Sequence, residues 1–141
     1  MADQTVSAQT SAFVADHARA ILITRRRDDG LQAAPIRVML DADQTIVAAT
    51  RETTAKVRNL VRDPRFALCV ISNEFGGGVW MTMEGQARII GLPEALDSLR
   101  AFYLARDGSV APEDEFAATM QEQGRVMLHF DVERSTPTPS R

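Results

Sequence analysis

TIVAATRETTAKVRNLVRDPRFALC, residues 45–69, is the stretch of sequence that decides the fold we expect. Residues 45–50 are β-branched or small and carry no charge, which is typical of a buried strand. The helix-forming residues that follow end at Asp63-Pro64, because the residue before a proline is disfavoured in the α region. Residues 66–71 then resume as an apolar strand. The stretch therefore predicts a strand, a short helix and a second strand in succession.

The start of that helix is the candidate binding site. A helix N-terminus presents unpaired N–H groups and the positive end of the helix dipole, which together favour phosphate. Thr53 or Thr54 would cap the helix, and Lys56 in its first turn would add a positive charge. Three apolar residues are expected on one face of the helix, towards the interior: Val57, Leu60 and Val61. The basic residues and Asn59 are expected on the other faces. The same pattern also fits an ordinary capped surface helix, and this alternative stays open.

Length and composition narrow the class of protein. At 141 residues, with 45% hydrophobic and 25% charged residues, the chain is expected to form one globular domain. Its net charge of −3 gives no general indication of binding to nucleic acid or to an anionic membrane. No apolar run approaches the ~20 residues of a membrane span, and the opening residues lack a basic segment followed by an apolar one. We therefore expect a cytoplasmic location.

The chain has few residues that could catalyse a reaction on their own. Cys69, the one cysteine, lies in an apolar strand and is expected to be a buried thiol. The two histidines, His17 and His129, show no metal-ligand spacing, and no Ser-His-Asp or Cys-His arrangement can be argued. We expect no metal site and identify no catalytic residue. The remaining chemistry is that of a bound cofactor, which the protein positions.

Alternation of apolar and polar residues predicts about six strands with helices packed around them. The predicted strands cover residues 20–24, 32–41, 45–50, 66–72, 79–90 and 125–133. Besides the central helix, one helix is expected to start at Ser7 or Thr10, one to run over residues 93–105 with Pro93 in its first turn, and one over 112–123. Residues 25–30, RRRDDG, predict a hairpin tip whose arginines are partly neutralised by the aspartates.

Several side chains predict contacts beyond the core of one chain. Residues 66–72 are apolar on both faces, as expected in a closed barrel covered outside by helices or by a partner subunit. Trp80 lies on the polar face of its strand, where it could meet a partner subunit or an aromatic ligand, or could cap the end of the barrel. Pro35 predicts an edge, a bulge or a close approach to the backbone. Arg37 among apolar neighbours predicts either a structural salt bridge or a ligand contact.

AKVRNLVRDPR, residues 55–65, resembles the motif of the flavin and deazaflavin oxidoreductases of the split β-barrel superfamily. This family is described as pyridoxamine-phosphate-oxidase-like and coenzyme F-420-dependent. Ala34-Pro35-Ile36 in the second strand and residues 83–87, MEGQA, match the same order. The similarity covers residues 12–133 and leaves flexible ends at 1–11 and 134–141. It implies a mainly β fold with peripheral helices, an FMN-binding split β-barrel, and a homodimer with its sites at the subunit interface.

The resemblance also implies which residues hold the cofactor. Residues of the central motif would lie on its phosphate and ribityl side: Thr54, Lys56 and Asn59. The isoalloxazine-type ring would lie along the backbone of two strands: Ala34, Pro35 and Ile36 in one, Ala49 and Thr50 in the other. Trp80 would lie at the ring or the substrate pocket, and Arg37 is a further candidate contact.

The cofactor implied is the deazaflavin coenzyme F-420, with FMN as the alternative. Thr54 stands where deazaflavin binders often carry an arginine, and Ala55-Lys56 stands where FMN oxidases tend to have Arg-Lys, so the choice stays open. The Lys-x-Arg-Asn-Leu spelling favours F-420, as would the three arginines at 25–27 if they formed a lip over its anionic tail.

The implied activity is hydride transfer between reduced F-420 and a small organic substrate that is unsaturated or heteroaromatic. Two other functions fit the same resemblance. One is an FMN-dependent oxidase or reductase of the pyridoxamine-phosphate-oxidase type. The other is a binding protein that holds a flavin, a deazaflavin or haem without turning over a substrate.

Overall fold

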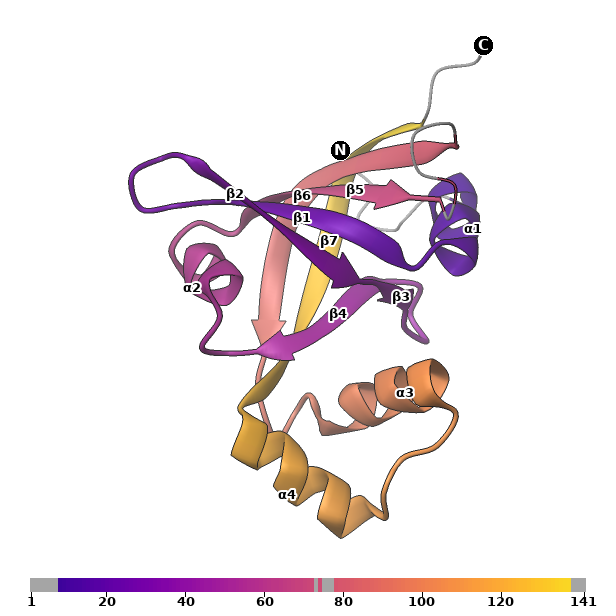
Figure 1. The fold of residues 1–141 in the computed structure, drawn as a ribbon, viewed down its shortest axis with the longest axis vertical. Coiled ribbons are helices and arrows are strands. Elements are labelled where there is room, and N and C mark those ends of the chain that lie inside the picture. The colour runs from indigo at the N-terminus through magenta and orange to yellow at the C-terminus, as the bar shows by residue number, and fades with distance from the viewer. Residues whose placement is uncertain (1–7, 73, 75–77, 138–141) are drawn as a thin grey trace.

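The structure, a computed structural model, describes residues 8–72, 74 and 78–137. Within these residues, seven strands form one antiparallel sheet in the order β2-β1-β5-β6-β7-β4-β3 (Figure 1). The strands are β1 (Arg19–Arg25), β2 (Leu31–Arg37), β3 (Met39–Leu40), β4 (Ile46–Arg51), β5 (Arg65–Ile71), β6 (Trp80–Ile90) and β7 (Arg125–Pro137). The helices are α1 (Ala8–Asp16), α2 (Ala55–Arg62), α3 (Leu96–Asp107) and α4 (Glu113–Gln123). The predicted mainly β architecture with peripheral helices is confirmed.

The sheet curls until its first strand, β2, approaches β4 near the other edge without pairing with it. We call this β2–β4 gap the seam. The prediction of one strand over residues 32–41 is wrong, because the chain leaves β1 at Val38 and joins β4 as β3. Val38 is fully buried, and its N–H donates to the carbonyl oxygen of Ala18 at 2.8 Å. The alternation of apolar residues continues through Val38, so the sequence pattern does not indicate that the chain changes from one edge of the sheet to the other here.

Alternate residues of the strands point into the barrel and form its core. The strand β6 keeps its alternation past a bulge, because the extra residue is Glu133 in the partner strand β7. A Cβ atom added at Gly85 would collide with the carbonyl oxygen of Asp131, so the bulge requires a glycine at this position.

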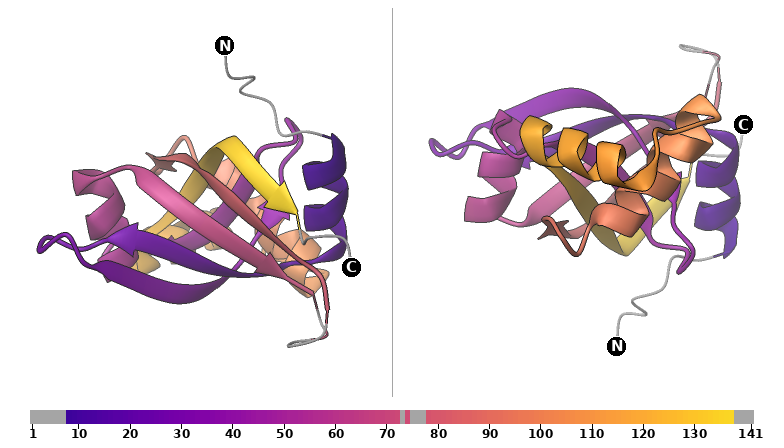
Figure 2. Two further views of the ribbon diagram at one scale, coloured as in Figure 1. Left: turned by 90° about the horizontal axis from the view of Figure 1, so that it is seen from above. Right: turned by 90° about the horizontal axis from the view of Figure 1, so that it is seen from below.

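The helices cover the barrel at its ends and on one outer side. Helices α1 and α2 lie at opposite ends, while α3 and α4 lie outside β4 and β7 (Figure 2). A second core cluster fills the space between these two helices and the sheet: Val47, Ala95, Leu99, Phe102, Tyr103, Phe116, Met120 and Met127. The predicted start of α3 at Pro93 is wrong. Ala95 N–H donates to Gly91 C=O at 2.9 Å and Leu96 N–H to Pro93 C=O at 3.1 Å, which forms a turn before the helix begins.

Strand β7 continues past its predicted end at Glu133. Residues 134–137 pair with the start of β6, from Arg134 opposite Glu84 to Pro137 opposite Met81. Their composition gives no indication of this pairing, because the partner strand is distant in the sequence. Residues 1–7 and 138–141 of the predicted flexible ends lie outside the described residues. No helix among the described residues is long and apolar enough to cross a membrane.

Candidate functional site

Helix α2 lies where the sequence placed it, but it is rolled about its axis relative to the prediction. Val57 and Leu60 are buried, whereas Val61 is 72% exposed and Asn59 is only 7% exposed. The prediction that Val61 faces the interior while Asn59 does not is therefore wrong. The roll places Lys56 on the partly buried side of the helix, one turn before Asn59 and Leu60.

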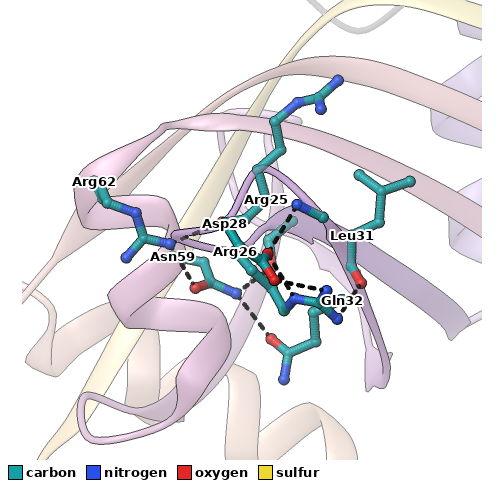
Figure 3. Close-up of polar contacts among 9 residues, drawn as sticks. Arg25, Arg26, Asp28, Leu31, Gln32, Asn59 and Arg62 are labelled. Atoms are coloured by element: carbon teal, nitrogen blue, oxygen red, sulfur yellow. Dashed lines mark hydrogen bonds and ion pairs between the residues drawn. The ribbon is translucent and has the colours of Figure 1, made fainter.

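A polar network fixes this orientation of the helix. The side-chain nitrogen of Asn59 donates to the Thr24 hydroxyl at 3.1 Å and to the Gln32 side-chain oxygen at 3.0 Å, which ties α2 to β1 and β2 (Figure 3). The Arg62 guanidinium donates to the side-chain oxygen of Asn59 at 2.9 Å and to the carbonyl oxygen of Arg25 at 3.0 Å. All polar atoms of the Asn59 side chain are thus bonded. Leaving such buried groups unpaired would cost about 1–3 kcal/mol.

The N-terminus of α2 has no side-chain cap. Thr54 is the N-cap residue and has an extended conformation, but its hydroxyl donates to the carbonyl oxygen of Arg51 at 2.9 Å. The prediction of a threonine cap is therefore wrong. The N–H groups of the first turn are not used by a capping side chain, so they keep their capacity to bind an anion.

Lys56 shares this corner of the molecule with a second cation, Arg125 at the start of β7. Burial lowers the pKa of the Lys56 ammonium, and the positive charge of Arg125 lowers it further. Among the described residues, neither side chain has a carboxylate within salt-bridge distance. Arg51 lies opposite Arg125 in the pairing of β4 with β7. A partly dehydrated pair of cations without an acidic partner is an electrostatic environment that favours a bound anion.

The Tyr103 ring of α3 connects Arg125 to a further arginine, Arg106. The Arg125 and Arg106 guanidinium carbons lie 6.0 Å and 4.8 Å from the centroid of the Tyr103 ring. Arg106 forms an ion pair with Asp107 at 2.8 Å. The hydrogen bond from Arg106 is the main cause of the lowered pKa of Asp107, and the charge of Arg37 contributes. Nothing in the sequence marks Arg106 and Arg125 as neighbours of Lys56, because their approach depends on the β4–β7 pairing and on the packing of α3.

The candidate residues of β2 point in two directions. Ala34 and Ile36 are half-buried, whereas Pro35 and Arg37 are exposed on the other face of the strand. The edge position predicted from Pro35 is confirmed, since β2 is the first strand of the sheet. Arg37 forms no ion pair among the described residues. In β4, both candidates are largely covered: Thr50 is buried, and Ala49 packs against the second core cluster.

Trp80 is remote from α2 within one chain. It lies opposite Ile71, which lies opposite Arg19 at the start of β1. Asn59 instead bonds to Thr24, near the other end of β1. The structure therefore brings Thr54 and Lys56 together at one corner and separates Trp80 from them. The assignment of these residues to a cofactor stays a prediction.

The hairpin tip is partly neutralised, as its sequence suggested. Arg26 and Asp28 form an exposed ion pair at 3.1 Å, and the hydrogen bond from Arg26 lowers the pKa of the Asp28 carboxyl. Asp29 adopts a left-handed φ of 70°, which closes the turn. The side chains of Arg25 and Arg27 form no ion pair among the described residues, although the charge of Arg25 contributes to the lowered pKa of Asp63.

A sequence model of one protein family matches almost the whole chain. The matching family is described as pyridoxamine 5'-phosphate oxidase, and the match covers residues 6–138. The chain belongs to the pyridoxamine 5'-phosphate oxidase family. Membership in this family confirms the recognition made from residues 55–65 and the split-barrel fold. No curated protein sequence matches the chain.

Solved structures share the pyridoxamine 5'-phosphate oxidase fold at low sequence identity. The conserved hypothetical protein Rv2991 from Mycobacterium tuberculosis aligns with a TM-score of 0.76 and 21% identity, over 95% of this chain and 84% of that chain. A protein described as an F-420 reductase gives 0.68 and 18%, over 93% and 98%. HutZ, the haem storage protein from Vibrio cholerae, gives 0.72 and 13%, over 95% and 95%. Since one neighbour is named for F-420 and another for haem, the fold alone does not select the cofactor.

Proposed function

We propose that this protein is an oxidoreductase that binds coenzyme F-420 and transfers hydride between the reduced cofactor and a small unsaturated or heteroaromatic substrate. The observation that carries the proposal is the pair of cations, Lys56 and Arg125, beside the uncapped start of α2. Family membership supports redox chemistry with a flavin-type cofactor. When bound, that cofactor supplies the hydride, and the protein supplies its position.

The chain's own residues fit a phosphate at this corner. A phosphate would offset the repulsion between Lys56 and Arg125 and would raise the pKa of Lys56. It would also accept hydrogen bonds from the first-turn N–H groups of α2. The hydroxyl hydrogen of Thr54 and the polar atoms of Asn59 are already bonded, so we assign these two residues to positioning the helix. Lys56 is therefore the side chain on which the tests are based.

Two arginines of the hairpin tip support F-420 over FMN. The tip lies beside α2, because Arg62 donates to the backbone of Arg25. Among the described residues, Arg25 and Arg27 form no close ion pair with a carboxylate. FMN ends at its phosphate, whereas F-420 continues into an anionic tail that exposed cations would attract. FMN is the second candidate, and it would not need these two arginines.

We also propose a homodimer with its sites at the subunit interface. The outer face of β1 and β5 carries a half-buried apolar patch: Ile21, Ile23, Ala67, Cys69 and Ile71. Helices α3 and α4 pack against other strands, and none of these five residues belongs to the core cluster beneath those helices. A second subunit would bury the patch. Because Trp80 and Lys56 are far apart in one chain, a shared site would take Trp80 from the partner subunit.

The test is titration of the purified protein with F-420 and with FMN. Binding is measured by the change in the absorbance and fluorescence of each ligand. The proposal expects saturable binding of F-420 that is tighter than binding of FMN and weaker in Lys56→Met. Oxidation of reduced F-420 is then compared with and without a panel of unsaturated acceptors. Binding without faster oxidation would support the non-catalytic alternative. If neither cofactor binds, the proposal is wrong.

A further inference from the structure

A cavity of about 320 Å³ lies between α1 and the start of β6, away from Lys56. Its main lining residues come from both elements: Gln9, Phe13, Asp16 and His17 of the α1 segment, and Trp80 and Met81 of β6. The residues from the α1 segment are three or four positions apart, so one face of the helix forms one wall. The cavity is within the size range of small-molecule sites.

The walls of this cavity are aromatic and apolar. The rings of Phe13 and His17 are 4.5 Å apart and tilted by 47°. Phe13 packs against the barrel core and Met81 is 3% exposed, so this wall is held in place by the protein interior. Trp80 is 40% exposed although it is the largest apolar side chain in the protein. A flat ligand in the cavity would cover part of this exposed ring.

The polar groups of the cavity favour a positive ligand. Asp16 is its one formally charged lining residue, and its carboxylate forms no ion pair among the described residues. The buried Nδ1 atom of His17 has no hydrogen-bond partner in the described part of the chain. A carboxylate beside aromatic rings is the chemistry that binds a cation, since the ring faces and the carboxylate both attract positive charge. Arg19, the cation in the same row of the sheet as Trp80, is separated from it by β5.

We propose that the α1–β6 cavity binds a small planar aromatic cation, such as a ring that carries an amidinium or a protonated amine. The ring lies against Phe13 and Trp80, and the positive group lies near Asp16. The site uses neither Lys56 nor Arg125, but it shares Trp80 with the site proposed at the subunit interface, so binding to the cavity is measured without F-420 or FMN.

The chain offers its own reporter for this site, because Trp80 is its only tryptophan. Benzamidine, benzamide and benzoate share one ring and differ in charge, so they separate the role of charge from that of shape. We expect benzamidine to change the emission of Trp80 in a saturable way, with weaker binding of benzamide and no binding of benzoate. Ligand-observed NMR gives the same affinities without relying on tryptophan emission.

Three variants complete the test. Asp16→Asn should weaken benzamidine binding by about two- to fivefold, the contribution of an exposed ion pair, and leave benzamide binding unchanged. Asp43→Asn, at an exposed aspartate between β3 and β4, is the matched control and should change neither. Trp80→Leu, measured by NMR, should weaken both ligands. The proposal is overturned if wild type binds benzamidine and benzamide equally, if no ligand saturates, or if Asp16→Asn behaves like the Asp43 control.

Discussion

Lys56 and Asn59 lie one turn apart in α2, but their polar groups differ in burial and in hydrogen-bond or charge partners. The Asn59 side chain is buried with every polar atom bonded. Lys56 is half-buried beside Arg125 and has no carboxylate within salt-bridge distance among the described residues. A compensated buried group stabilises the fold, whereas an uncompensated charge lowers stability until a ligand neutralises it. Substitutions at the two positions should therefore have opposite consequences.

Lys56→Met removes the charge and keeps most of the side-chain length. We expect cofactor affinity to fall by about ten- to a hundredfold, since one charge-assisted phosphate contact contributes ~1.5–3 kcal/mol. The free energy of unfolding without ligand should stay the same or rise. Titration and urea unfolding measure the two quantities, and Arg58→Met, at an exposed position of the same helix, is the control. Unchanged affinity would make Lys56 an ordinary surface residue.

The stability difference between wild type and Lys56→Met should depend on pH. The pKa of Lys56 is lowered from 10.5, so the unfolded chain binds more protons than the folded chain between the two pKa values. The cost of the charged lysine is therefore full at neutral pH and fades as the pH rises through the lowered pKa towards 10.5. Urea unfolding of both proteins at neutral and alkaline pH measures this. A difference that grows with pH would contradict the assigned cause.

Asn59→Ala removes three side-chain hydrogen bonds and leaves the buried Thr24 hydroxyl without this partner. We expect the free energy of unfolding to fall by about 1–3 kcal/mol. Arg58→Ala, one position earlier and exposed, should cost less than about 0.5 kcal/mol. Urea unfolding compares the two. If Asn59→Ala weakens cofactor binding but leaves stability unchanged, Asn59 contacts the cofactor directly, as the family resemblance implies.

At the scale of helices and strands, the sequence predicted features that neighbouring residues decide. Helix α2 ends before Asp63-Pro64, and the hairpin tip closes at Asp29, because both depend on local backbone preferences. Features that depend on distant partners were missed. Val38 leaves one edge of the sheet for the other, and α2 is rolled by bonds to residues more than twenty positions away. Of the candidate site, the sequence marked Lys56 but not its neighbour Arg125, and the role of both in cofactor binding stays a prediction.

The hairpin tip gives a test of cofactor choice. We expect the double variant Arg25→Gln, Arg27→Gln to weaken F-420 binding at low salt, most for cofactors with long anionic tails, and to leave FMN binding unchanged. Salt should reduce the effect, because exposed charges are screened over ~8–10 Å at physiological ionic strength. Arg26→Gln is the control, since its charge is already paired with Asp28. If wild type and the double variant bind F-420 equally well at low salt, the hairpin tip is a solvated turn that does not contact the cofactor.

At the scale of the whole molecule, the covering of the barrel is unequal. One outer side is buried by α3 and α4 through a second core cluster, and the two ends are covered by α1 and α2. The strand β5, apolar on both faces, has its inner side chains buried and its outer ones half-buried. The sequence predicted that helices or a partner subunit would cover this outer face, and no described helix packs there as α3 and α4 pack on β4 and β7. The partner subunit that we propose would cover this face.

Ile21→Arg tests this proposal directly. Ile21 belongs to the apolar patch and lies between Pro35 of β2 and Cys69 of β5. We expect wild type to have twice the chain mass of 15.5 kDa by light scattering at micromolar concentration, and the variant to have the mass of one folded chain. An arginine in the interface would leave an unpaired charge where two apolar surfaces meet. Val61→Arg, at a 72% exposed position of α2, should stay dimeric. If the sites lie at the interface, Ile21→Arg should also lose cofactor affinity while Val61→Arg keeps it, and a monomeric wild type would refute the dimer.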